Sequence, residues 1–202
     1  MQCPILVFGV PFLEEINVKL FGLFGLIFLL PPMMALGQSD LPGDSVYQVG
    51  GHWQNQQAET VELAGLRGKK QVVSMIYTHC EHACPVIVSS MKSIAASLPE
   101  QMKHEVGFVL VTFTPSMDTP DVLAEFARRQ NLGKDQWSLL RTDDDTIRDL
   151  SMVLGVKYER LDNNEVNHSN LVSVLDEQGR LVFQESGALG ASRLIVERIV
   201  NH

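Results

Sequence analysis

The sequence predicts a three-layer α/β domain with a mixed central sheet. Two apolar runs, at 71–77 and 106–113, lack the alternation of a half-exposed strand and are therefore typical of strands buried on both faces. Each run is followed by a segment in which apolar residues recur at helical spacing. Near the C-terminus, Asp176-Glu177-Gln178-Gly179 separates two further apolar runs and indicates a β-hairpin. Strands that alternate with helices and then pair as a hairpin produce a mixed sheet between helical layers.

Composition bounds the architecture and excludes one class of partner. The chain has 202 residues, of which 45% are hydrophobic, and this suits one globular domain with a substantial core. Its formal net charge is −8, and its basic residues form no stripe along the sequence. We therefore expect no nucleic-acid partner, because surfaces that bind nucleic acid are strongly basic.

The N-terminal segment has the features of an export signal. Lys19 precedes the uncharged run Leu20–Leu30, and a proline pair and the small residue Gly37 follow. This order is typical of a secretory signal cleaved near Gly37. The run is shorter than the roughly 20 residues of a spanning helix, and an uncleaved membrane anchor is the alternative. We expect a protein that is periplasmic, or anchored in the membrane and facing the periplasm. The predicted organisation is a leader at 1–37, a tether at 38–51 and the folded domain at 52–202.

Local signals place the elements of the first half of the domain. Val46–Val49 and Thr60–Leu63 are expected to be short strands ahead of the first buried strand. From Pro85 to Leu98 apolar residues recur at helical spacing, and Pro99 ends that helix.

The second half contains clear helix boundaries. Thr119 supplies a capping hydroxyl ahead of Pro120, and the helix is expected to run to about Leu132, with Gly133 as its cap. The further expected elements are a strand at 137–140, a helix at 143–154, hairpin strands at 171–175 and 180–185, and a closing helix at 192–200.

Two cysteines, Cys80 and Cys84, stand on the short loop between the first buried strand and its helix. A helix N-terminus favours thiolate over thiol, because its dipole and free N–H groups stabilise negative charge. Thiolates in this position exchange disulfides or bind a soft metal, and the spacing alone does not decide between these roles. A purely structural disulfide is less favoured, because a bridge that closes so short a loop stabilises a protein little.

A cysteine pair between a strand and its helix, with a late hairpin, is the thioredoxin-like arrangement. Such folds carry a cis-proline ahead of the hairpin, facing the cysteines, but this chain has no proline after Pro120. His168 stands at the equivalent point, directly before the strand at 171–175. Two thiolates and one imidazole form a ligand set suited to copper. Four other histidines of the folded domain are expected to lie at the surface, namely His52, His79, His82 and His104.

Several motifs together carry a family resemblance that runs from about Ser45 to the C-terminus. They are Trp53, Leu66-Arg67-Gly68-Lys69, Tyr77-Thr78-His79-Cys80 with Cys84-Pro85, Asp118-Thr119-Pro120, and His168-Ser169-Asn170 with Leu175-Asp176. With these motifs the sequence resembles the Sco/SenC family, thioredoxin-like copper chaperones for cytochrome c oxidase assembly.

The resemblance implies one copper ion per chain, held by Cys80, Cys84 and His168. It also implies delivery of copper to the CuA site of cytochrome c oxidase subunit II, or reduction of the cysteines of that site, with a thiol reductase as a further partner. The alternative is a metal-free periplasmic thiol-disulfide oxidoreductase or redox sensor, in which Cys80 and Cys84 are the redox pair. A peroxiredoxin-like peroxidase is less favoured, because the block of proline and threonine that precedes the peroxidase cysteine is missing.

Two positions depart from the family pattern in the loop after the second buried strand. Thr114 stands before Pro115 where the family has an aspartate, and Met117 replaces an arginine. This predicts less polar and less charged surroundings for the metal, and leaves open another copper acceptor or a role in redox sensing.

Overall fold

The computed structural model describes residues 41–79, 83–161, 165–187 and 189–202. The predicted leader at 1–37 lies outside these ranges, and so does Cys80. The backbone of Cys84 is described, but its side chain is not. Among the described helices, none is both long and apolar enough to cross a membrane.

In this part of the chain, seven strands form one mixed sheet in the order β2-β1-β5-β4-β3-β8-β9. The strands are β1 (Trp53–Asn55), β2 (Thr60–Val61), β3 (Lys70–Ile76), β4 (Val106–Thr112), β5 (Trp137–Arg141), β8 (Leu171–Leu175) and β9 (Leu181–Ser186). The three central strands β3, β4 and β5 are parallel, whereas β8 is antiparallel to β3 and β9 is antiparallel to β8. The predicted mixed sheet with its late hairpin is confirmed.

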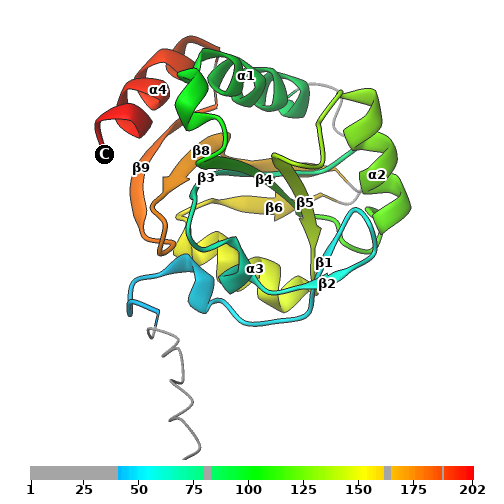
Figure 1. Ribbon diagram of the computed structural model, residues 1–202. Coiled ribbons are helices and arrows are strands. Elements are labelled where there is room, and N and C mark those ends of the chain that lie inside the picture. The colour runs from blue at the N-terminus through cyan, green and yellow to red at the C-terminus, as the bar shows by residue number, and fades with distance from the viewer. Residues whose placement is uncertain (1–40, 80–82, 162–164, 188) are drawn as a thin grey trace, which may run out of the picture. The chain divides into compact units, whose positions relative to one another are not determined.

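Helices cover both faces of this sheet (Figure 1). α1 (Ala83–Ser97) and α4 (Ser192–Asn201) lie together on one face, and α3 (Asp144–Val153) lies on the other. α2 (Pro120–Arg129) packs beside β5. The molecule therefore has the three layers that the sequence predicts.

The central strands are mostly apolar because they are covered on both sides. Val72 in β3, Phe108 in β4 and Leu139 in β5 have no exposed surface. The ring of Phe108 stacks on Trp137, with 4.8 Å between the centroids. Such packing makes the sheet a rigid base for the loops at its edges.

Helix starts follow the predicted capping chemistry. The Thr119 hydroxyl accepts a hydrogen bond from the Val122 N–H at 3.4 Å, ahead of Pro120 at the first turn of α2. At α3 the Asp143 carboxylate accepts from the N–H of Thr146 at 2.9 Å. Both boundaries therefore depend on local chemistry that is visible in the sequence.

Helix α2 ends three residues earlier than the sequence predicts. The helix ends at Arg129, and Asn131 has a left-handed φ of 54°. The N–H of Leu132 then donates to the carbonyl of Ala127 at 2.9 Å, which closes the helix. Asparagine can adopt this conformation at low cost, so Gly133 is not the cap.

The strand predicted at Val46–Val49 is instead a 3₁₀ helix, η1 (Val46–Gln48). The Ser45 hydroxyl accepts from the N–H of Tyr47 at 3.2 Å and starts this turn. Tyr47 is buried and packs against Gly179, where an added Cβ would lie 2.5 Å from its ring. Part of the segment predicted to be a tether therefore packs on the β8–β9 turn.

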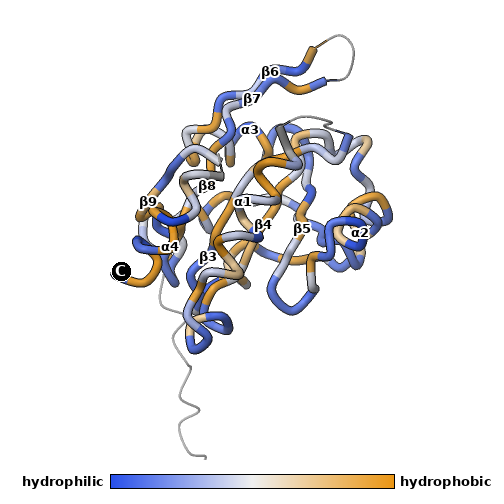
Figure 2. The backbone as a smooth tube through the Cα atoms, turned by 90° about the horizontal axis from the view of Figure 1, so that it is seen from above, coloured by the Kyte–Doolittle hydropathy of each residue, from blue (hydrophilic) through white to orange (hydrophobic). Residues whose placement is uncertain are grey.

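A second, two-stranded sheet is absent from the sequence prediction. β6 (Tyr158–Arg160) pairs antiparallel with β7 (Val166–His168), and the two project away from the central sheet (Figure 2). The prediction placed His168 in a loop, whereas it is the last residue of β7. Three-residue strands of mixed polarity give no usable period, so they are not visible in the sequence.

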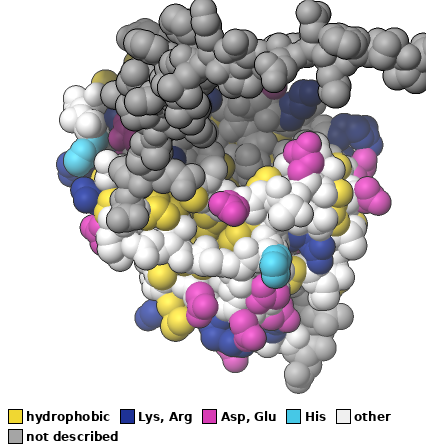
Figure 3. Space-filling model, turned by 60° about the horizontal axis from the view of Figure 1, so that its bottom comes forward, with side chains coloured by type: hydrophobic (Ala, Val, Ile, Leu, Met, Phe, Trp, Pro, Cys, Tyr) yellow, Lys and Arg dark blue, Asp and Glu magenta, His cyan; other side chains and the backbone are white. Residues whose placement is uncertain are grey.

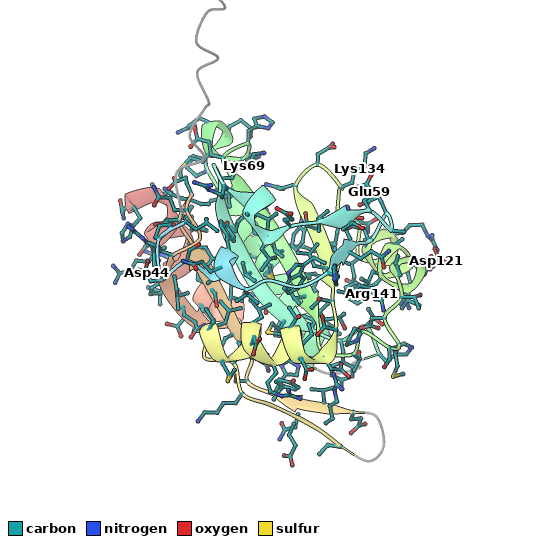
Figure 4. All side chains as sticks on the ribbon, turned by 90° about the horizontal axis from the view of Figure 1, so that it is seen from below. Asp44, Glu59, Lys69, Asp121, Lys134 and Arg141 are labelled. Atoms are coloured by element: carbon teal, nitrogen blue, oxygen red, sulfur yellow. The ribbon has the colours of Figure 1, made fainter. Side chains whose placement is uncertain are left out.

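The side chain of Arg141, at the end of β5, connects the loop after β4 to strand β1 (Figure 4). Its guanidinium donates to Gln54 Oε1 at 3.0 Å and to the Pro115 carbonyl at 2.8 Å. The loop that carries Thr114 is thus attached to β5 and β1 by this side chain.

Charges of both signs are mixed on the surface. On the face shown in Figure 3, acidic and basic side chains lie interspersed, with hydrophobic side chains between them. Several form ion pairs one helical turn apart, such as Arg128 with Glu125 at 2.6 Å. Exposed pairs of this kind contribute little to stability.

Candidate metal centre

The carboxyl ends of β3 and β4 meet at one edge of the sheet, where the chain enters the cysteine loop. The N–H of Phe113, directly after β4, donates to the carbonyl of Ile76 at the end of β3, at 2.8 Å. Thr78 and His79 continue from β3, and Cys80 follows outside the described ranges. In α/β folds this edge is where ligands usually bind.

A buried carboxylate, that of Asp118, holds the segment that leads into the loop. It has no exposed surface, and it accepts hydrogen bonds from the N–H of Thr78 at 3.2 Å and from its hydroxyl at 2.5 Å. The hydroxyls of Thr112 and Thr114 donate to the same carboxylate. His79 Nδ1 lies 3.7 Å from Oδ1. These donors replace the water that a buried carboxylate loses.

Thr114, one of the two departures from the family pattern, belongs to this network. Its hydroxyl donates to Asp118 Oδ2 at 2.9 Å, and its side chain is almost wholly buried. An aspartate there would place a second carboxylate against a fully buried one, so a hydroxyl removes a like-charge repulsion. Met117, the other departure, is partly exposed.

The start of α1 lies at the second cysteine. The helix begins at Ala83, two residues before the predicted start at Pro85, so the backbone of Cys84 is in its first turn. The expected helix N-terminus at the cysteine pair is therefore confirmed for the backbone. Free N–H groups of a first turn lower the pKa of a nearby thiol, which favours the thiolate needed for metal binding or disulfide exchange.

Gly187 brings three elements together beside α1. Its N–H donates to the carbonyl of Asn170 at 2.8 Å, just before β8 begins. A Cβ added to Gly187 would lie 3.0 Å from Ile87 in α1 and 3.5 Å from Val172 in β8. The segment that follows His168 therefore lies close to the first turns of the helix that carries Cys84.

His168 is held between two aromatic rings at this edge. Its ring centroid is 4.8 Å from that of Phe113, and 6.2 Å from that of Tyr77 with nearly perpendicular planes. In the β6–β7 register it stands directly opposite Tyr158. Tyr77 is close to the cysteine loop in sequence, so the imidazole is placed on the loop's side of the sheet.

The surroundings of His168 favour the form that binds metals. Burial lowers its pKa below the ordinary value of 6.5, and the hydrogen bond to the Ser169 carbonyl opposes this only in part. Nδ1 lies 3.3 Å from that carbonyl oxygen, which can only accept, so Nδ1 carries the proton. The lone pair of the neutral ring is then on Nε2, which is the usual arrangement of a metal-binding histidine.

Of the histidines predicted to lie at the surface, His79 is exposed beside Asp118, and His82 lies outside the described ranges. His104 is exposed and precedes β4, at the end of the sheet opposite the cysteine loop. His52 lines a surface pocket of about 360 Å³ together with Arg141. Within the described residues, no three His, Cys, Asp or Glu side chains are arranged to hold a metal. The predicted set of Cys80, Cys84 and His168 falls only partly within these residues and stays a prediction.

The Asp118 network was not predicted as part of the site. The sequence showed Asp118-Thr119-Pro120 as a family motif and Thr119-Pro120 as a helix start, and both features are present. Asp118 accepts hydrogen bonds from Thr78, which is 40 residues away in the sequence, and no local pattern reveals such a contact.

Comparison with known proteins agrees with this architecture. The family model described as SCO1/SenC matches residues 44–199. The SCO2-like protein of Rickettsia prowazekii is 28% identical over 168 residues, which cover 79% of this chain and 80% of the relative.

Solved structures show the same fold. The structure of Arabidopsis thaliana ScoI with copper bound has a TM-score of 0.66 at 17% identity, covering 75% of this chain and 97% of that one. BsSco, a member of the Sco family of cytochrome c oxidase assembly proteins with a disulfide switch, has a TM-score of 0.66 at 21% identity, covering 77% of this chain and 92% of that one. The thioredoxin-like fold is therefore confirmed. Because the family match spans most of the folded domain, the protein belongs to the SCO1/SenC family.

Proposed function

We propose that this protein is an exported copper metallochaperone that delivers copper to the CuA site of cytochrome c oxidase subunit II. Cys80 and Cys84, as thiolates, and neutral His168 hold one copper ion. The acceptor's ligands replace these three in turn. Copper supplies the soft Lewis acid that two thiolates and an imidazole match, and the chain positions those groups.

The placement of His168 is the observation that supports this proposal most strongly. Burial lowers the pKa of its imidazole, and the ring lies against two aromatic rings at the edge where β3 leads into Cys80. A metal-free redox protein has no need of a neutral histidine at the point where thioredoxin-like enzymes carry a proline. Related Sco structures contain copper, which supports the same assignment.

The proposed compartment is the periplasm, either as a released protein or anchored through the leader. In that oxidising compartment Cys80 and Cys84 tend to form a disulfide, which cannot supply two thiolates. A dithiol reductase must then reduce the pair and become oxidised itself. We propose such a reductase as the second partner.

A thiol-disulfide oxidoreductase is the second candidate function. Here the thiols of Cys80 and Cys84 reduce a disulfide between the cysteines of the CuA site to two thiols, and Cys80 and Cys84 themselves become a disulfide. The position of Cys84 in the first turn of α1 supports this role, because it favours the attacking thiolate.

Copper(I) titration of the reduced domain, residues 38–202, separates the two candidates. We expect one equivalent to bind, with each of Cys80→Ser and Cys84→Ser abolishing binding and His168→Ala weakening it roughly 10- to 100-fold or more. His104→Ala is the matched control, since His104 lies at the opposite end of the sheet. If His168→Ala binds copper as the wild type does, the metallochaperone assignment is wrong. Full disulfide exchange in that variant would then favour the oxidoreductase.

A further inference from the structure

The hairpin that carries His168 has no backbone support from the central sheet. β6 and β7 hydrogen-bond only to each other among the described strands. A two-stranded hairpin this short is at best marginally stable in water. Apart from the short link to β8, where the Asn170 carbonyl accepts from the Gly187 N–H, side-chain contacts must therefore position His168 relative to the rest of the fold.

One face of the hairpin makes these contacts. The register pairs Tyr158 with His168 and Arg160 with Val166, and residues two apart on a strand share a face. Val166 is buried, and the Tyr158 ring lies 5.0 Å from that of Phe113. The four side chains thus form the inner face.

Arg160 links this inner face to two separate parts of the domain. Its Nη2 donates to the Phe113 carbonyl at 2.7 Å and to Asp144 Oδ1 at 2.5 Å. Asp144 is the first residue of α3, and the hairpin lies alongside this helix in Figure 4. Phe113 is in turn hydrogen-bonded to Ile76, at the end of the strand that enters the cysteine loop.

The ion pair is too exposed to matter much for overall stability. The Arg160 side chain is 40% exposed and that of Asp144 is 53% exposed. Pairs in such positions contribute little to the free energy of unfolding. The contact to the Phe113 carbonyl is different in kind, because it fixes the hairpin to a residue whose own N–H is hydrogen-bonded to Ile76 at the end of β3.

We propose that Arg160 is a positioning residue for the copper ligand His168. By holding β6 against the Phe113 carbonyl and the start of α3, it sets where the imidazole stands relative to Cys80 and Cys84. The inference rests on the proposed function, because it assigns Arg160 an effect on copper binding. It adds a residue that lies outside the three ligands and whose side chain never touches the metal.

Arg160→Met tests this, since it removes both hydrogen bonds and keeps a long apolar side chain. The affinity of the reduced Arg160→Met domain for copper(I), measured by competition, is expected to fall about tenfold. Losses of this size are typical when a group that orients a metal ligand is removed. In the metal-free protein, the amides of β6 and β7 are expected to exchange faster with deuterium, while the melting temperature changes little.

Arg148→Met is the matched control. Arg148 pairs with Asp145 on α3 at 2.7 Å and lines the same surface pocket as Arg160, but its pair lies within the helix. The Arg148→Met substitution removes one positive charge from the same region. It is expected to leave copper affinity and the amide hydrogen exchange of β6 and β7 unchanged. An equal loss of affinity in this variant would show a general charge effect and overturn the proposal.

A double mutant shows whether Arg160 acts through His168. Adding Arg160→Met to His168→Ala should cause no further loss of copper affinity. A further tenfold loss, or unchanged exchange of the β6 and β7 amides in the single variant, would overturn the positioning role. If the wild type binds no copper, the proposed function fails, while the hydrogen-exchange result still decides whether Arg160 fixes the hairpin.

Discussion

The ring of His168 packs against the ring of Phe113, with 4.8 Å between their centroids and 44° between their planes. Phe113 also contacts Tyr158, the residue opposite His168 in the hairpin. A single buried side chain, from the end of β4, therefore supports both strands of the hairpin that carries the proposed ligand.

Phe113→Leu should weaken copper binding more than its effect on stability suggests. Loss of the ring removes the surface on which the imidazole rests, and the smaller side chain costs about 1–2 kcal/mol of folding stability. Copper affinity and urea unfolding measure the two effects. Phe108→Leu is the control, because Phe108 is equally buried but stacks on Trp137, away from the hairpin. Equal copper affinity in the two variants would contradict the prediction.

Asp118→Ala should destabilise the fold by about 3 kcal/mol, because it leaves several buried donors without an acceptor. Thr78 would lose the partner of both its N–H and its hydroxyl, so the entry to the cysteine loop should loosen. We expect a lower midpoint in urea and faster alkylation of the cysteines in the reduced protein. Asp121→Ala, an exposed change in the first turn of α2, should do neither. Unchanged stability of Asp118→Ala would contradict the network described here.

Gly187→Ala should separate the His168 segment from α1. The added methyl would lie 3.0 Å from Ile87, so the helix or β8 must move by a few tenths of an ångström. We expect a loss of about 1–2 kcal/mol of stability and weaker copper binding, since the two sides of the proposed site move apart. Gly133→Ala is the comparison, because a Cβ there meets no atom within 4 Å. A Gly187→Ala protein with wild-type copper affinity would argue against a site between these segments.

Acid should remove the contribution of the Arg160–Asp144 pair. The hydrogen bond from Arg160 holds the pKa of Asp144 below its ordinary value of 3.8. A carboxyl whose pKa is lower in the folded state stabilises the protein above 3.8, and this contribution is lost as the pH falls through the folded pKa.

The free energy of unfolding of the wild type and of Asp144→Asn should therefore differ most above pH 3.8, by no more than about 1 kcal/mol for so exposed a pair, and converge below it. Asp143, whose pKa is also lowered by its hydrogen bonds to Thr146, titrates in the same region and remains in both proteins. Its own hydrogen bonds to Thr146 contribute to both proteins, and only its repulsion with Asp144 differs between them. A difference that stays constant with pH would show that the Asp144 carboxylate is not what Arg160 stabilises.

Much of the fold could be predicted because its signals are local. The runs at 71–77 and 106–113 are mostly apolar and do not alternate with polar residues, and this follows from burial on both faces. Thr119 and Asp143 begin their helices through bonds to residues three positions away. Two predictions were wrong, for the segment at Val46 and for the end of α2. Ser45 starts a 3₁₀ turn through its hydroxyl, and Asn131 ends α2 through a left-handed backbone conformation. The hydrophobic pattern of the sequence contains neither signal.

The sequence by itself determined the α/β class, the cysteine pair at a helix start, and His168 as the histidine set apart by its position before β8. Only the tertiary structure showed that Phe113 and Tyr77 pack against that histidine. It also showed that Asp118 binds Thr78 at the start of the cysteine loop, and that Arg160 connects the β6–β7 hairpin to α3. The physical reason is distance along the chain. Hydrophobic periodicity and capping act within a few residues, whereas each of these contacts joins residues at least 16 positions apart in the sequence.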